Sequence, residues 1–294
     1  DSGFCGQLDT SNSSSVLEVN GPFNSAEVWD IIVDSDDMSG YGNFKLQIQG
    51  EKLVSHSYAV STVNIVFVDI STNSKAVLET DETNDILTGN DDYTQVFVND
   101  NFSFEFFGKK QNKVIVDVNG FITFDASSWT NFTNTNIPDE GEPNSIIAAF
   151  WDDLSPKDQN CAGYYCPIVG KVYTLIQGTA PNRVYTIMYK KFNYDTLAVN
   201  GGTGEYNFEI IMYEVTGVVE LVYGVMDDFG TTTDTTNTAN CELATIGLEG
   251  QDLDPNDPNI LPPGVLYCFD GKDDAGGNTS INSIQALRFT PTIL

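Results

Sequence analysis

Residues that could carry out covalent chemistry are scarce in this sequence. His56 is the only histidine, and a nucleophilic serine or cysteine needs an imidazole or another base beside it. The chain has no Gly-x-Ser-x-Gly elbow, no His-Glu-x-x-His helix and no glycine-rich loop opening a helix that could hold phosphate. We interpret His56 as a surface or strand-end residue and expect that the protein is not an enzyme.

Carboxylates are abundant instead. With 42 acidic residues, pairs of carboxyl groups arise by chance, so a glycosidase, which needs two of them flanking a bond, stays an alternative. Calcium binding has a more specific signal, because oxygen-bearing side chains alternate as they do in loops that bind hard cations; these are Asp252, Asp254, Asn256 and Asp257. Asp152 and Asp153 are a further candidate. Solvated turn residues would give the same pattern, so Ca²⁺ is the one cofactor suggested, and it stays open.

The five cysteines suggest an oxidising compartment. Cys161 and Cys166 lie in the segment CAGYYC, whose short loop can close as a disulfide, and no further cysteine or histidine nearby suggests a metal site. Cys241 and Cys268 are expected to form a second pair. Cys5 is then left over, either free or bonded to another chain, and the sequence does not fix this connectivity.

Other features of the sequence also suggest an extracellular location. Sequons for N-glycosylation occur at Asn12, Asn101, Asn131 and Asn278. No apolar run is as long as the roughly 18 residues of a membrane-spanning helix. The chain carries no signal peptide and begins at Asp1, which suggests a processed N-terminus. We expect an extracellular or cell-surface glycoprotein that does not span a membrane.

The charge restricts the partners. A formal net charge of −29 repels nucleic-acid phosphates and anionic membranes, so both are discounted. The acid could bind calcium, keep the protein soluble in salty water, or simply be a solvated surface. A hydrophobic content of 40%, with 12% aromatic residues, is enough to build a core.

The elements that must position these residues are strands. Short runs rich in Val, Ile, Phe and Tyr alternate with turns of Gly, Asn and Asp. We expect a hairpin at Asn119-Gly120, with φ above zero at both turn positions, and a second one at Thr216-Gly217. The run 146–151 is apolar throughout and predicts a central strand. The other predicted strands are 45–49, 63–70, 77–80, 95–98, 113–118, 121–124, 171–177, 183–189, 206–214, 218–223, 244–248, 264–269 and 283–290.

This pattern predicts an all-β protein with two β-sandwich-like domains, jelly-roll or Ig-like, and little helix. We expect an N-terminal β domain over residues 1–80 and a larger sandwich domain over residues 93–294. Between them, residues 81–92 are polar and acidic, and they read as a linker or loop.

From Phe102 to Gly250 the chain resembles nidogen-like domains and related β-sandwich modules of microbial secreted surface proteins. The blocks that carry the resemblance are, in order, FSFEFFGKKQNKVIVDVNGFITF, IPDEGEPNSIIAAFWDDLSP, GKVYTLIQG, YNFEIIMYEVTGVVELVYG and ATIGLEG. The resemblance implies extracellular matrix or surface roles through protein–protein contact and no shared chemistry. The Cys161–Cys166 segment departs from the pattern.

Two functions follow as expectations. The first is a structural or adhesive surface glycoprotein, the self-assembling subunit of a filament or surface layer. The alternating segments 15–19 and 284–289 would add to the sheet edges of neighbouring copies, so a homo-oligomer is expected. The second is a carbohydrate-binding or glycan-active secreted protein, in which Trp129, Tyr164 and Tyr165 would stack on sugars.

Overall fold

The fold is taken from a computed structural model. It describes residues 56–89, 92–97, 102–125, 133–139, 141–157, 167–194, 205–227, 244–251, 261–269, 272–273 and 285–293. The chain divides into two compact units, residues 1–52 and 53–294, and all of the described residues belong to the second.

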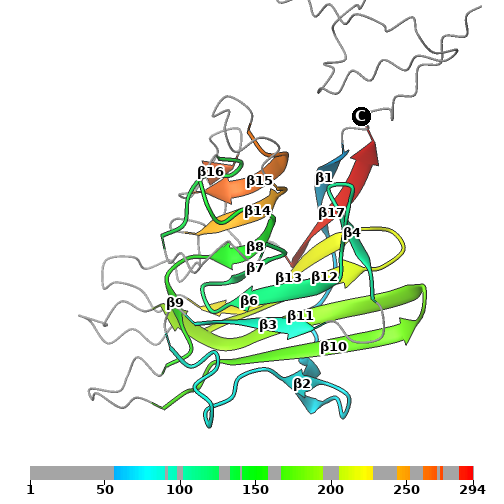
Figure 1. The fold of residues 1–294 in the computed structure, drawn as a ribbon. Helices are drawn as coiled ribbons and strands as arrows, with labels where there is room; N and C mark the ends of the chain where they lie inside the picture. Colours follow the sequence, from blue (N-terminus) through cyan, green and yellow to red (C-terminus); the bar gives the residue numbers. More distant parts are fainter. Residues whose placement is uncertain are drawn as a thin grey trace, which may run out of the picture. The chain divides into compact units, whose positions relative to one another are not determined.

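The described residues form two large antiparallel sheets and a small hairpin (Figure 1). The first sheet is eight-stranded, with the order β1 (His56–Val63), β17 (Ala286–Ile293), β13 (Val219–Asp227), β12 (Glu205–Tyr213), β11 (Asn182–Tyr194), β10 (Lys171–Thr179) and β2 (Val77–Leu78), while β9 (Leu154–Ser155) pairs with β11. The second sheet is seven-stranded, with the order β16 (Lys272–Asp273), β15 (Gly264–Phe269), β14 (Thr245–Glu249), β8 (Ile146–Trp151), β7 (Phe121–Thr123), β6 (Lys113–Asp117) and β3 (Tyr93–Phe97). The hairpin pairs β4 (Phe104–Phe106) with β5 (Lys109–Gln111). The predicted all-β sandwich class is confirmed.

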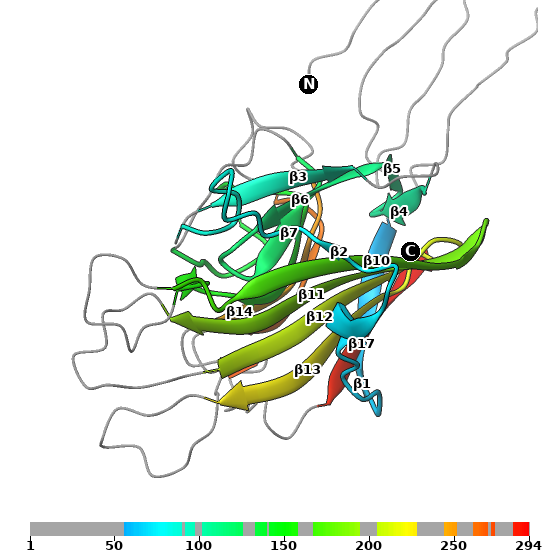
Figure 2. The same ribbon diagram turned by 90° about the horizontal axis from the view of Figure 1, so that it is seen from below.

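The two sheets face each other across one apolar core (Figure 2). Buried tyrosines of the first sheet reach across it to the backbone of the second. The Tyr189 hydroxyl lies 2.8 Å from the carbonyl oxygens of both Asp117 and Phe121, and the Tyr223 hydroxyl donates to the Ala149 carbonyl over 2.8 Å. Since a buried hydroxyl without a partner is unfavourable, these bonds help to fix how the sheets face each other.

β8 is the central strand that the sequence predicted. All six of its residues are buried, because both of its faces are covered. Ile147 and Ala149 face the core between the sheets. Ile146 and Trp151 belong to a second cluster on the other face, together with Phe121 of β7.

The predicted hairpin at Asn119-Gly120 is confirmed, but its turn differs in detail. Asp117 pairs with Phe121, so the turn has three residues, Val118 to Gly120. Gly120 has a φ of 84°, whereas Asn119 is not among the residues with positive φ. The Gly120 carbonyl accepts hydrogen bonds from the Ala149 and Phe150 N–H groups of β8. The turn is therefore buried against the neighbouring strand, as the complete burial of Asn119 also shows.

The predicted strand at 63–70 is wrong. β1 ends at Val63, and residues 64–76, here called the strap, run over the outer face of the first sheet, the face turned away from the second sheet. The strap contains the single-turn helix η1 (Ile70–Thr72), and the Asp69 carboxylate caps it by accepting the Ser71 N–H over 2.9 Å. A capped turn at this point ends the extended conformation.

The domain boundary also differs from the predicted one near residues 81–92. β1 and β2 precede that segment in sequence, yet both belong to the first sheet, beside β17 and β10 respectively. Residues 81–89 form a turn closed by hydrogen bonds between Asp81 and Ile86. The compact unit that holds the sandwich begins at Leu53 instead.

Candidate functional site

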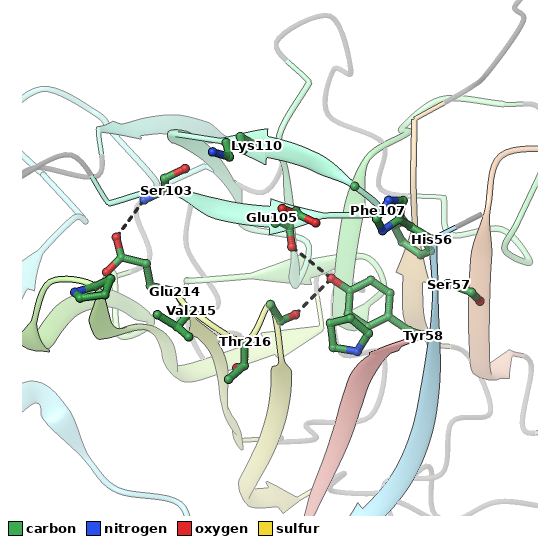
Figure 3. Close-up of a pocket in the computed structure, with 14 residues that line it drawn as sticks. His56, Ser57, Tyr58, Ser103, Glu105, Phe107, Lys110, Glu214, Val215 and Thr216 are labelled. Atoms are coloured by element: carbon green, nitrogen blue, oxygen red, sulfur yellow. Dashed lines mark hydrogen bonds between the residues drawn. The ribbon is translucent and has the colours of Figure 1, made fainter. Parts of the chain in front are cut away.

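A pocket of about 330 Å³ lies where the β4–β5 hairpin meets the start of β1 and the turn after β12 (Figure 3). Each part of its wall comes from a different segment of the chain. The residues that line it are His56, Ser57, Tyr58, Ser103, Glu105, Phe107, Gly108, Lys110, Pro181, Glu214, Val215, Thr216, Gly217 and Pro291. Sequence reasoning missed this pocket, because its residues share no local motif.

Tyr58 is held in place by its hydroxyl group. The hydroxyl lies 3.1 Å from the Gly217 carbonyl oxygen and 3.4 Å from that of Glu105. Its ring makes an edge contact with Phe107 at a centroid distance of 4.9 Å. Burial raises the pKa of Tyr58 well above its ordinary value. The phenol therefore stays protonated and acts as a fixed hydrogen-bond donor.

His56 is the first residue of β1, which agrees with the predicted strand-end position. Its ring packs against Gly108, where a Cβ atom would lie only 2.4 Å from the imidazole. Gly108 also has a φ of 77°, a conformation that favours glycine. Among the described residues no hydrogen bond joins His56 to a serine or a carboxylate.

Glu214, which lines the pocket, forms a largely buried ion pair with Arg183. Its carboxylate accepts the Arg183 Nε–H over 2.7 Å and a second hydrogen bond from the same guanidinium group. The two side chains are only 9% and 7% exposed. The hydrogen bond from Arg183 holds the pKa of Glu214 below its ordinary value. Glu214 is thus an ionised structural group that also accepts the Ser103 N–H.

The remaining charges in the wall, Glu105 and Lys110, lie opposite each other in the β4–β5 hairpin. The pocket therefore combines hydrogen-bonding groups, balanced charge and one aromatic wall, Phe107. Such a lining is typical of a binding site for a small ligand, and no nucleophilic side chain in it is hydrogen-bonded to a base.

A second feature is the edge formed by β1. This strand pairs with β17 at all eight positions without a bulge, and β17 is its one partner among the described strands. Its sequence, HSYAVSTV, contains no Lys, Arg, Asp, Glu or Pro. The other edge strands are shorter, with two residues in β2, two in β16 and five in β3. β1 is therefore the longest of the strands that end the two sheets, and it is uncharged; the other open stretch is residues 175–179 of β10, which β2 does not reach.

β17 itself is not an edge. The sequence suggested segment 284–289 as a strand for addition to another copy, but β17 lies between β1 and β13 and pairs with both. Its backbone is used within the chain.

Most of the predicted site residues lie outside the described residues. These are the sequons Asn12, Asn101, Asn131 and Asn278, the calcium candidates Asp252, Asp254, Asn256 and Asp257, four cysteines (Cys5, Cys161, Cys166 and Cys241) and the aromatic residues Trp129, Tyr164 and Tyr165. Cys268 is buried in β15 and engaged in a disulfide, and the predicted pairings stay predictions. Asp152 is buried and accepts the Asp153 N–H.

Neither a cluster of metal-binding side chains nor a membrane-spanning helix occurs among the described residues. No group of three or more His, Cys, Asp or Glu residues that could hold a metal occurs in this part of the chain. No helix found there is long and apolar enough to cross a membrane.

Comparison with known proteins gives one match. A family model described as NIDO related matches residues 57–262. The match extends beyond the resemblance noted from 102 to 250 at both ends, and it includes most of β1. No curated protein and no solved structure matches the chain.

Proposed function

The chain belongs to the NIDO-related, or nidogen-related, family, and from that premise we propose that it is an extracellular structural or adhesive protein without enzymatic activity, whose copies join by strand addition. Domains of this family are generally extracellular. The glycans, the disulfides and the calcium suggested by the sequence belong to the same proposal.

The observation that supports strand addition is the β1 edge. Proteins that stay monomeric usually protect such an edge with charge, proline, a bulge or a very short strand. β1 has none of these protections along its eight residues. An incoming strand would gain a ladder of backbone hydrogen bonds along its whole length. We propose that residues 1–19 of a neighbouring copy supply this strand.

Electrostatic repulsion has to be overcome for this to occur. Copies that each carry a net charge of −29 repel one another, and salt at physiological concentration screens that repulsion beyond about 8 Å. An uncharged edge is the place where two such surfaces approach with the smallest local penalty. We therefore expect association to strengthen as ionic strength rises.

Two variants test the two halves of this contact. Deletion of residues 1–19 removes the added strand, and Ala59→Lys places a charge on an exposed position of the β1 edge. Each variant alone should sediment as a monomer under conditions in which the full chain associates. Mixed together they should form a one-to-one dimer, because one keeps the edge and the other keeps the strand.

The control is Gln177→Lys, which adds the same charge at an exposed position of β10, on the opposite side of the first sheet from β1, and it should associate like the parent chain. If the deletion variant forms the same assembly as the full chain, residues 1–19 are not the connector. If Ala59→Lys also leaves assembly unchanged, the β1 edge is not the acceptor.

A second candidate function is the binding of a carbohydrate in the pocket. It is favoured by the aromatic Phe107 beside hydrogen-bonding side chains in a cavity of about 330 Å³, since binding sites for small ligands begin at about 300 Å³. Binding of the purified protein to a glycan array that is lost on Lys110→Ala and kept on Ala59→Lys would favour this function over assembly.

A further inference from the structure

The strap packs on the outer face of the first sheet through a small apolar cluster. Ile70 of the strap packs with Leu175 of β10 and Met188 of β11, and Phe67 and Ala76 complete the contact. Phe67 also covers Gly224 of β13, where a Cβ atom would lie 2.9 Å from its ring. The strap contacts several strands by side chains, without joining the hydrogen-bonded ladder of the sheet over residues 64–76.

A carboxyl group lies beneath this strap. Glu209 of β12 is only 2% exposed. Its neighbours across the sheet are Met188 on β11 and Val222 on β13, both of them apolar. The backbone N–H of Val68 in the strap lies near its carboxylate and favours the ionised form. Glu209 thus lies buried beside Met188, the β11 residue on which the strap packs.

The charged groups around Glu209 do not compensate the negative charge that its own carboxylate carries when it is ionised. From the strap, Asp69 faces it with a like charge. On β11, the ammonium group of Lys190 lies 2.7 Å from the carboxylate of Asp69. On β13, Val222 and Gly224 are uncharged, and Glu220, the next residue on this face, is paired with Arg288 of β17, whose Nε–H it accepts over 2.7 Å. Asn207 of β12 is uncharged. Burial raises the pKa of Glu209 to about 7, the Val68 N–H opposes this rise, and Asp69 adds to it.

We propose that the strap is a pH-sensitive clasp, closed over the first sheet while Glu209 is protonated and loosened when Glu209 ionises. The neutral carboxyl fits the apolar cluster, whereas the ionised one is buried beside Asp69 and gains solvation when the strap lifts. The sign follows from the raised pKa. Closure is strongest below the ordinary value of 4.5 and weakens as the pH rises towards 7.

The expected size of the effect follows from the same shift. With a pKa of about 7 in the closed state and 4.5 in the open state, the opening constant should rise on the order of 30-fold between pH 5.5 and pH 8.5. Opening would uncover the apolar cluster around Leu175 and Met188. The clasp would thereby change which surface the first sheet presents in acidic and in neutral surroundings.

The test is hydrogen–deuterium exchange of the strap in the intact chain at several pH values, with the intrinsic pH dependence of exchange divided out. Protection of residues 64–76 should fall on the order of 30-fold from pH 5.5 to pH 8.5, while protection of β11 stays unchanged. In Glu209→Gln, which is neutral at both pH values, the strap should stay equally protected. Glu105→Gln, which removes a carboxylate from the β4–β5 hairpin, should behave like the parent chain.

A pH dependence that persists in Glu209→Gln would overturn the proposal, and so would a parent strap that is equally protected at both pH values. If Glu209→Gln does not fold, the carboxyl group of Glu209 can be titrated by carbon NMR in the parent chain. A midpoint near 7 that coincides with the midpoint of strap protection supports the clasp, and a midpoint near 4.5 contradicts it.

Discussion

At the scale of single residues, a few positions accept only one type of side chain. Gly120 is the clearest case. Its φ of 84° lies in the left-handed region, and a Cβ atom there would lie 2.0 Å from the Phe150 carbonyl oxygen. The contact involves backbone on both sides, so neither partner can move away without disturbing β8. This turn fixes the position of β7 beside β8 in the second sheet.

We predict that Gly120→Ala destabilises the protein by at least about 3 kcal/mol or prevents folding, because positive φ alone costs about 1–2 kcal/mol for alanine and the clash adds to it. The measurement is urea unfolding of the purified variant beside the parent.

Gly141→Ala is the matched control, since Gly141 is exposed and a Cβ atom would meet only the flexible Asp139 side chain at 3.0 Å. Equal stability of the two glycine variants would show that the contact at Phe150 is not tight.

At the scale of elements, the segment before β4 is attached to the first sheet by one buried ion pair. Glu214 follows β12, and Arg183 lies on β11. The Glu214 carboxylate also accepts the Ser103 N–H, and Arg183 lies over the Phe102 ring at 5.6 Å. The pair therefore joins three parts of the chain at the pocket wall, and it should set the position of the β4–β5 hairpin.

We predict that Arg183→Leu lowers the free energy of unfolding by about 3–5 kcal/mol, because it leaves Glu214 buried without its cation. The double variant Arg183→Leu, Glu214→Leu should recover most of this loss. Urea unfolding at pH 7 measures both.

In the parent chain the ion pair contributes to the free energy of unfolding at pH values above the ordinary pKa of Glu214. This contribution is lost as the pH falls through the lowered pKa of Glu214 in the folded protein. A double variant as unstable as the single one would contradict this view of the pair.

The strands were predictable where the signal was local. The hairpins at 119–120 and 216–217 follow from turn residues, and β8 follows from an unbroken apolar run. The strap was misread because alternation reports one buried face and does not report a hydrogen-bonded neighbour. Phe67 packs towards the sheet and Val66 and Val68 are exposed, which is the pattern of a strand.

The candidate site could not be predicted in the same way. The pocket gathers residues from positions 56 to 291, and neither a motif nor a spacing links them. The β1 edge was missed because HSYAVSTV has only weak apolar character. Its strand conformation depends on β17, which is distant in sequence.

At the scale of the whole molecule, every described strand of the sandwich lies within residues 53–294. Its core runs from Tyr58 to Phe289, and all of these residues belong to one compact unit. Residues 1–52 form a unit of their own. The described core therefore comes entirely from residues of the second unit.

We predict that a fragment of residues 53–294 folds by itself, unfolds cooperatively and stays monomeric, because it keeps the core and the β1 edge but lacks residues 1–19. Circular dichroism should give a β spectrum, and sedimentation should give a single monomeric species. A fragment that is unfolded would show that the first unit is needed, and a fragment that assembles like the full chain would contradict the proposed connector.

The pairing of β1 with β17 also determines what happens while the chain is being translated. Val63 is made long before Ala286, its partner at one end of the pair, and at about 5–20 residues per second the interval is on the order of 10 to 45 s. The meander from β10 to β13 can close hairpin by hairpin as it emerges. Throughout that interval β1 lacks its partner strand β17, and it is exposed to the β1 strands of neighbouring nascent chains on the same polysome.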